Sequence, residues 1–366
     1  MSIRVGVVGI DLRKLKGEFG SQALQSSGNN FGNMLFTNAV YNQIENCTHI
    51  GFHFDSAKVK QECTHIVIPA SNWVNKKEDW GFLADLLIET DLPVCVVGLG
   101  SQLENEYDID GISEGTKRFL RVISEKSTFI GVRGLFTKKV LENLGIFNVR
   151  ALGCPSIFSR RNIPKLREFS TSSRLRIGVG PTRYHLPNAS ELHHDDKQRA
   201  LYQFAYEEAS SIYYQSEAFE IGLMNREDVS SKFALALNYY NEDDEEKFVD
   251  IIMSKGKYHK DLDQWIADVR KDDLYIGTRI HGAVTSILAG TPAILLTHDN
   301  RTRELSKIMG VPSFELKSFD MSRLRQIHTL LQDVDFDATT PACERNIIGF
   351  KEFYQENGLN LIDFEL

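Results

Sequence analysis

The sequence predicts an α/β protein made of two doubly wound, Rossmann-like domains. The chain has 366 residues, and single hydrophobic cores stop growing at about 250–300 residues, so the length favours two domains. Short apolar, β-branched runs alternate with segments of helical spacing, which is typical of mostly parallel sheets with helices on both faces. A charged segment without periodicity, 161–174, interrupts this alternation once. We therefore expect domains at 1–160 and 175–338, a linker at 161–174, and a tail at 339–366 whose helix packs back on the first domain.

In the first domain, the apolar runs predict buried strands and the amphipathic segments predict helices. We expect strands at 3–10, 49–54, 64–70, 93–98, 128–134 and 149–153, and helices at 34–44, 82–89, 112–126 and 135–144. The first strand is followed by a long loop, 11–33, that ends in G-N-N-F-G-N. Asn30 or Asn33 is either an ordinary helix N-cap or part of a ligand-facing loop, since long loops in compact domains are often functional.

In the second domain, the same patterns continue to the tail. We expect strands at 175–180, 219–224, 274–277, 293–297 and 313–316, and helices at 195–214, 227–240, 259–270, 283–289, 321–331 and 343–354. The acidic run 241–246 is expected to form the first turn of a further helix, because negative charge is favourable at a helix N-terminus.

Basic side chains gather in the stretch 273–305, which reads as strand, turn, helix, strand and polar turn. Arg279 and His281 follow the strand 274–277, and Arg301 and Arg303 follow the strand 293–297. The carboxyl ends of parallel strands meet at one edge, where open α/β sheets bind ligands. Arginines beside helix N-termini at that edge indicate an anion site.

Composition and spacing exclude several other classes of protein. The formal net charge is −8, which argues against electrostatic binding of nucleic acid. The five cysteines form no C-x-x-C pair, and no His/Cys spacing indicates a metal site. The turn L-G-S-Q (99–102) lacks the third glycine of a dinucleotide fingerprint. No apolar run approaches the ~20 residues of a membrane span, and no signal peptide is evident, so we expect a cytoplasmic protein.

Three motifs give the chain a resemblance to the polysaccharide pyruvyl transferase family. They are Y-I-G-T-R-I-H-G (275–282), A-G-T-P-A-I-L-L (289–296) and H-D-N-R-T-R-E-L (298–305). Upstream, G-V-R-G (131–134) and N-F-G-N (30–33) are similar to that family's arginine-bearing strand and opening N-x-G-D turn. The chain departs from the family pattern at Asn33 and Cys154, where the family carries acidic residues, and at Arg301, where some members carry lysine.

The resemblance implies a GT-B-like fold, with two domains facing across a cleft. It also implies transfer of a pyruvyl group from phosphoenolpyruvate, with no cofactor, to a hydroxyl pair of a glycan or lipid-linked sugar in polysaccharide biosynthesis. By this resemblance the catalytic residues are Arg279 and His281. The expected site residues are Arg279, His281, Gly282, Arg301 and Arg183 for the donor, and Asn30, Asn33, Gly100, Ser101 and Gln102 for the acceptor.

The chemistry of the reaction is compatible with these residue types. Phosphoenolpyruvate carries a phosphate and a carboxylate, and arginine binds both groups with planar, bidentate donors. Helix amides from Gly282 onward add donors, and His281 handles protons near neutral pH. Arg279 has a structural alternative as a partner of Asp273 or Asp299, and His281 as a helix cap. At the level of function, the alternatives are a GT-B glycosyltransferase with a nucleotide-sugar donor and a non-catalytic binder of a phosphorylated metabolite.

Overall fold

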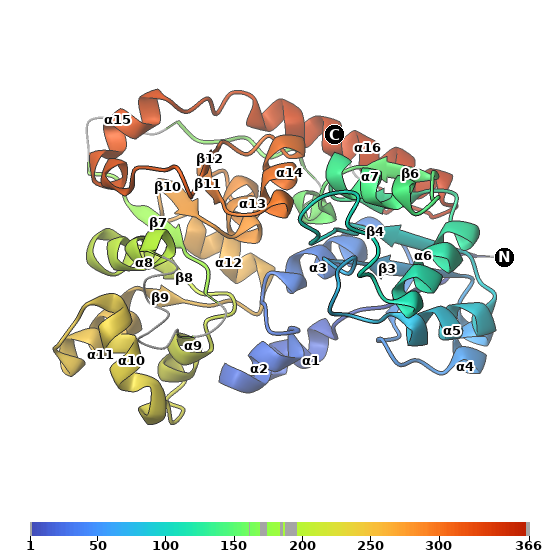
Figure 1. Ribbon diagram of the computed structural model, residues 1–366, viewed down its shortest axis with the longest axis horizontal. Coiled ribbons are helices and arrows are strands. Elements are labelled where there is room, and N and C mark those ends of the chain that lie inside the picture. The colour runs from blue at the N-terminus through green and yellow to red at the C-terminus, as the bar shows by residue number, and fades with distance from the viewer. Residues whose placement is uncertain (1, 161, 169–173, 184–185, 187–195, 364–366) are drawn as a thin grey trace.

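A computed structural model of the chain describes residues 2–160, 162–168, 174–183, 186 and 196–363. Two parallel sheets form the centres of two α/β domains (Figure 1). The sheet of the first domain has the order β2-β1-β3-β4, and a parallel bridge from Leu99 to Val132 continues it into the pair β5–β6. Its strands are β1 (Val5–Val7), β2 (Cys47–His49), β3 (His65–Pro69), β4 (Val94–Val97), β5 (Ile130–Val132) and β6 (Val149–Ala151).

The second sheet has the order β12-β11-β10-β7-β8-β9. Its strands are β7 (Ile177–Gly180), β8 (Ser211–Tyr213), β9 (Gly256–Lys257), β10 (Leu274–Gly277), β11 (Ala293–Thr297) and β12 (Ser313–Glu315). In both sheets the chain runs outward from the first strand and then returns to its other side, which is a doubly wound topology with switch points at β1/β3 and β7/β10. The predicted fold class, a GT-B-like pair of doubly wound domains, is confirmed.

Helices alternate with these strands along the chain. Those before β7 are α1 (Leu12–Gly17), α2 (Gly20–Ser26), α3 (Asn33–Gln43), α4 (Ser56–Glu62), α5 (Gly81–Thr90), α6 (Glu114–Lys126), α7 (Leu135–Asn143) and η1 (Pro155–Phe158). Those after it are α8 (Asp196–Glu208), α9 (Ala218–Met224), α10 (Ser230–Tyr240), α11 (Glu245–Lys255), α12 (Leu262–Val269), α13 (Ile280–Leu288), α14 (Asn300–Ile308), η2 (Met321–Gln326), α15 (Ile327–Gln332) and α16 (Thr339–Glu356). None of the described helices is long and apolar enough to cross a membrane.

The last helix, α16, reaches from the second domain across the first (Figure 1). Its C-terminal end meets the β5–β6 pair: Asn357 accepts a hydrogen bond from the Phe129 amide at 3.2 Å, and Arg150 pairs with Glu356. Phe353 packs against Gly131, where an added Cβ would lie 3.0 Å from the ring. The segment 162–168 holds no helix or strand in its described part, and residues 161 and 169–173 lie outside the description.

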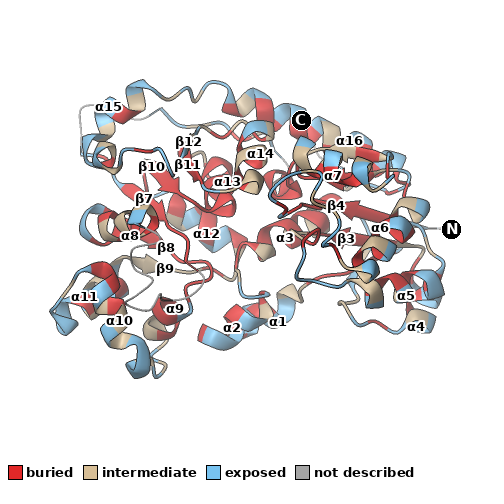
Figure 2. Ribbon diagram, in the orientation of Figure 1, coloured by how far each residue is buried: buried red, intermediate tan, exposed pale blue. Residues whose placement is uncertain are grey.

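A hydrophobic core joins the two domains. Buried residues concentrate on the strands and on the inner faces of the helices (Figure 2). The larger buried cluster contains first-domain residues such as Phe36 and Val97 together with second-domain residues such as Ile276. Because apolar burial drives association, this shared core holds the two domains against each other.

Three sequence predictions of local structure were wrong. The predicted loop 11–33 contains the short helices α1 and α2, and the predicted strand 219–224 is the helix α9. Strand β8 lies inside the predicted helix 195–214, whose first residue is outside the description. Helices this short gain their stability from tertiary packing rather than from propensity, and short apolar runs do not distinguish helix from strand.

Candidate functional site

Arg279 and His281 lie at the switch point of the second sheet, beside the first domain. Arg279 is the N-cap of α13, directly after β10, and His281 is in the first turn of that helix. The glycine at 282 is required by packing, because an added Cβ there would lie 2.0 Å from the Tyr275 hydroxyl oxygen. The backbone at Gly282 therefore packs directly against Tyr275, a buried residue of the preceding strand.

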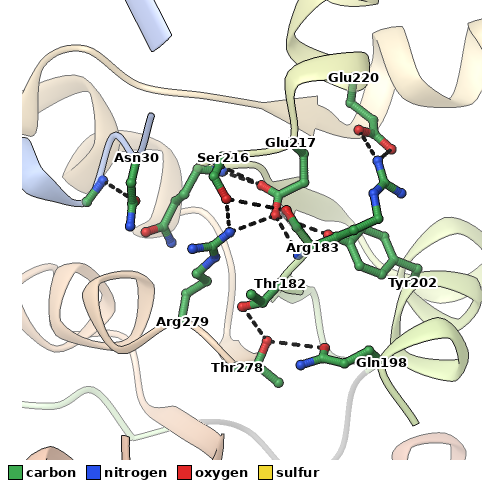
Figure 3. Close-up of polar contacts among 12 residues, drawn as sticks. Asn30, Thr182, Arg183, Gln198, Tyr202, Ser216, Glu217, Glu220, Thr278 and Arg279 are labelled. Carbon is green, nitrogen blue, oxygen red and sulfur yellow. Dashed lines mark hydrogen bonds and ion pairs between the residues drawn. The ribbon is translucent and has the colours of Figure 1, made fainter. Parts of the chain in front are cut away.

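The guanidinium of Arg279 is buried and held by the turn that follows β8. Its Nη2 donates to Glu217 Oε1 at 2.9 Å and to the Ser216 hydroxyl (Figure 3). The sequence-based alternative named Asp273 or Asp299 as the carboxylate partner. The structure gives Arg279 Glu217 instead, whereas Asp299 pairs with Arg301.

Glu217 is the fully buried centre of a hydrogen-bond network. Besides Arg279, its carboxylate accepts hydrogen bonds from the Tyr202 hydroxyl and from the backbone amides of Arg183, Gln215 and Ser216. Burial alone would raise the pKa of Glu217, but Arg279 and these amides outweigh it and lower the pKa below its ordinary value. Glu217 therefore stays ionised and fixes the position of Arg279.

His281 is buried at the junction of the domains. Its Nε2 lies 3.6 Å from Cys154 Sγ, and its ring packs 5.6 Å from the Phe36 ring of the first domain. Burial lowers the pKa of His281 well below its ordinary value, and the charges of Arg133, Arg301 and Arg279 lower it further. The imidazole is therefore neutral at neutral pH, the form in which one ring nitrogen carries no proton.

Arg133 is the member of this cluster that the sequence prediction of site residues missed. It follows β5, it is 2% exposed, and it donates to the Gly98 carbonyl at 2.9 Å and to Asn72 Oδ1 at 2.7 Å. The pKa of Arg133 is below its ordinary value, mainly because the guanidinium is buried. The nearby Cys154 partly offsets this effect, and the charge of Arg301 adds to it. The signal was present in the sequence, because T-F-I-G-V-R-G repeats the pattern of a strand followed by arginine seen at 274–279.

Arg301 brings the predicted donor and acceptor sides together. It lies in the first turn of α14, and its Nη2 is 3.0 Å from Asp299 Oδ2. It lines a cavity of about 400 Å³ with Ser101 and Gln102, which come from the turn after β4. Gly100 lies behind them, where an added Cβ would be 2.8 Å from Arg133 Cδ.

The loop before α3 contributes Asn30 and Asn33, which face different surroundings. Asn30 Oδ1 accepts from the Gly32 amide at 2.9 Å, whereas Asn33 Nδ2 donates to the Ser27 carbonyl at 3.0 Å. The N-cap of α3 is Gly32, without a side-chain hydrogen bond, so neither asparagine is that cap. Gly32 itself touches the site, since an added Cβ would lie 2.5 Å from His281 Nδ1.

Arg183 lies beside Glu217, but its guanidinium points away from Arg279 (Figure 3). It donates to both carboxylate oxygens of Glu220, at 2.6 and 2.5 Å, and stacks over the Tyr202 and Tyr239 rings. To contact a donor, it would have to leave a buried carboxylate, so the structure does not bring Arg183 together with Arg279 and Arg301. Arg303 is held by Asn300 and Glu315 at the surface.

Residues 30–300 match the sequence model described as polysaccharide pyruvyl transferase. The chain belongs to the polysaccharide pyruvyl transferase family. The matched range contains Gly32, Arg133, Cys154, Arg279 and His281. A comparison with curated proteins gave no match.

Solved structures with a similar fold share about a tenth of the sequence. A putative UDP-N-acetylglucosamine 2-epimerase from Listeria monocytogenes has 10% identity and a TM-score of 0.46, with 97% of this chain and 98% of that chain covered. The Anabaena protein HepE in complex with UDP and glucose has 10% identity and a TM-score of 0.46, with 98% of each chain covered. An S. aureus MnaA–UDP structure has 10% identity and a TM-score of 0.48, covering 97% of this chain and 98% of that one.

The candidate site thus consists of cations around a neutral histidine. Arg133, Arg279 and Arg301 come from three different strand-to-helix turns, and each acts on the pKa of His281. Within the described ranges, no group of three His, Cys, Asp or Glu side chains is placed to hold a metal ion. The arrangement can bind an anion with arginines and move a proton with the imidazole.

Proposed function

We propose that this protein transfers a pyruvyl group from phosphoenolpyruvate to a pair of sugar hydroxyls, forming a ketal in the biosynthesis of a surface polysaccharide or another glycan. Family membership supports the class of enzyme. The observation that carries the specific reaction is the convergence of Arg133, Arg279 and Arg301 on the neutral His281 at the domain junction. No cofactor is included in the proposal, since the donor is itself a substrate.

The donor would be bound by the arginines. Its phosphate and carboxylate lie close together, and guanidinium groups match both in charge and in planar geometry. Arg301 lies at a cavity, with its side chain 14% exposed, while Arg279 and Arg133 are buried behind it. The amides at the start of α13, including that of Gly282, add the positive end of a helix dipole.

His281 would act as the base in the addition step. The neutral imidazole takes the proton of an acceptor hydroxyl, whose oxygen forms a bond to the second carbon of the donor. The protonated ring is disfavoured beside three arginines, so it gives this proton to the methylene carbon, which becomes a methyl group. Loss of phosphate then allows the second hydroxyl to add to the same carbon, and its proton leaves with the phosphate.

The acceptor would enter on the side of the first domain. Ser101 and Gln102 share a cavity with Arg301, and Asn30 holds the Gly32 loop beside His281. These residues place polar groups of the first domain next to the proposed donor arginines. The acceptor in this proposal is a glycan or a lipid-linked sugar.

The proposal is tested by incubating the protein with phosphoenolpyruvate and a panel of oligosaccharide and lipid-linked acceptors. Phosphate release that depends on an acceptor, with pyruvyl addition seen by mass spectrometry, supports it. Arg279→Ala and His281→Ala should each lower the rate at least about a hundredfold. Arg118→Ala, which removes a surface partner of Asp85, is the matched control and should retain the rate. Turnover of nucleotide sugars alone would identify a glycosyltransferase, and anion binding without turnover would identify a binding protein.

A further inference from the structure

The side-chain amide of Gln215 is buried beside the candidate site. Gln215 is 1% exposed, and among the described residues neither its Oε1 nor its Nε2 has a hydrogen-bond partner. Buried amides are normally paired, because an unmade hydrogen bond costs free energy. An unpaired amide beside a candidate site therefore indicates a group that a ligand completes.

The main chain of Gln215, by contrast, is fixed from both domains. Its amide donates to Glu217 Oε2 at 2.7 Å, and its carbonyl accepts from the Phe31 amide of the first domain at 2.9 Å. The hydrogen bond to Phe31 crosses the domain junction. The contact with Glu217 lies within the second domain, so it holds the backbone of Gln215 in place even where the hydrogen bond to Phe31 is open. A side chain on a backbone that is already fixed binds a ligand at a lower entropic cost.

The free amide points toward the proposed proton-transfer group. An added Cβ on Gly32 would lie 2.8 Å from Gln215 Oε1, 2.5 Å from His281 Nδ1 and 3.0 Å from Asn30 Oδ1. Three polar atoms from three turns therefore meet around the backbone of one glycine. Since Gly32 covers them, a ligand reaches them when the 30–32 loop withdraws and the Phe31–Gln215 hydrogen bond opens.

The polarity of the amide selects the class of ligand. Oε1 only accepts and Nε2 only donates, so both are completed by groups that can donate and accept, as a hydroxyl does. A phosphate or carboxylate oxygen has no proton for Oε1, and Arg133, Arg279 and Arg301 already provide cations for such anions. We propose that Gln215 is a specificity-determining residue that binds a hydroxyl of the sugar acceptor through its amide, next to the hydroxyl that reacts at His281. This inference rests on the proposed function and names the C-terminal domain's contribution to acceptor recognition.

The test is Gln215→Met, which removes both polar atoms at nearly constant volume. We expect the KM for the acceptor to rise about tenfold, with the KM for phosphoenolpyruvate unchanged. The melting temperature without ligand should not fall, because the substitution removes an unpaired buried amide. Gln198→Met is the matched control: Gln198 is a buried glutamine of the same domain whose Oε1 accepts from Thr278. This control should leave the KM for the acceptor unchanged.

Deoxygenated acceptors supply the second measurement. With the wild-type enzyme, the KM for one deoxy analogue should exceed the KM for the intact acceptor by about the factor that Gln215→Met causes. With the Gln215→Met variant, the KM for that analogue should be no higher than the KM for the intact acceptor. The assignment would be overturned if the substitution raised the KM for phosphoenolpyruvate instead. It would also be overturned if the effects of the substitution and of deoxygenation on the acceptor KM were fully additive for every analogue.

A failure of the proposed function can be distinguished from a failure of the Gln215 assignment. If the wild-type protein transfers no pyruvyl group to any acceptor, the proposed reaction is wrong, and Gln215 is tested by titrating wild-type and Gln215→Met proteins with methyl hexosides by NMR. Binding by the wild-type protein alone supports the hydroxyl-binding role. Equal binding by both proteins, or by neither, contradicts it.

Discussion

At the scale of single residues, the candidate site is defined by charge around His281. Three arginines and burial keep the imidazole neutral, and Glu217 keeps one of those arginines in place. Cys154, at the position where the resemblance implies an acidic residue, places a thiol near Nε2 of this ring. A carboxylate there would favour the protonated imidazole, so cysteine is consistent with a neutral base.

Removing the charge of Arg133 should shift the pH dependence of the enzyme. In Arg133→Met, the pKa of His281 is expected to rise, because one of the cations that lower it is gone. A base works only when deprotonated, so the acid limb of kcat/KM should move to higher pH. An NMR titration of the His281 ring checks the cause, and an unchanged acid limb with a shifted ring pKa would show that His281 is not the base.

Neutralising Glu217 should destabilise the fold strongly. Glu217→Gln leaves the buried Arg279 without its carboxylate partner, and breaking a buried pair typically costs about 3–5 kcal/mol. Denaturant unfolding measures this loss. Glu356→Gln, which breaks the exposed pair with Arg150, is the control and should cost at most about 1 kcal/mol.

At the scale of elements, the site depends on how tightly β10 packs against α13. The Tyr275 side chain occupies the space beside Gly180, Gly277 and Gly282, each of which would place an added Cβ within 2.6 Å of its hydroxyl oxygen. These glycines let the turn that carries Arg279 and His281 lie close to the sheet. The sequence motif Y-I-G-T-R-I-H-G thus has a steric reason as well as a chemical one.

A methyl group at position 282 should therefore disturb the site. Gly282→Ala is expected to cost about 1–3 kcal/mol of stability by overpacking and to lower activity by displacing His281. Adding Tyr275→Phe to the Gly282→Ala variant should recover part of the lost stability, because it removes the hydroxyl that clashes with the new Cβ. The recovery is partial, since the ring carbon 2.5 Å from that Cβ remains. Thermal unfolding of both single variants and the double variant measures this, and strictly additive effects would contradict the steric explanation.

At the scale of the whole molecule, side chains of one domain complete elements of the other. The Glu304 carboxylate on α14 accepts hydrogen bonds from the amides of Phe136 and Thr137 at the start of α7, and from the Thr137 hydroxyl at 2.8 Å. The Ser21 amide likewise donates to Glu227 across the junction. These contacts, together with the shared core, fix the distance between the proposed donor and acceptor sides.

Loss of the Glu304 contact should loosen the junction near α7. Glu304→Ala is expected to cost about 1–3 kcal/mol and to speed amide hydrogen exchange at Phe136 and Thr137. Burial raises the pKa of Glu304, so its folded-state pKa lies above the unfolded value and stability falls as pH rises between the two values. Glu304→Gln should remove that dependence. Glu315→Ala, at an exposed pair within the second domain, should change neither exchange nor stability appreciably.

The sequence by itself determined the fold class and predicted where the candidate site lies. Apolar runs such as 274–277 and 293–297 are local patterns, and the carboxyl-edge rule places Arg279 and Arg301 near each other once the strands are parallel. The tertiary structure alone decided which partners these side chains take. Glu217 is separated from Arg279 by 62 residues, and Cys154 from His281 by 127, so no local pattern relates them. For the same reason the sequence did not reveal the pairing of Arg183 with Glu220. It also did not reveal α1, α2 and α9, whose stability comes from packing against distant parts of the chain.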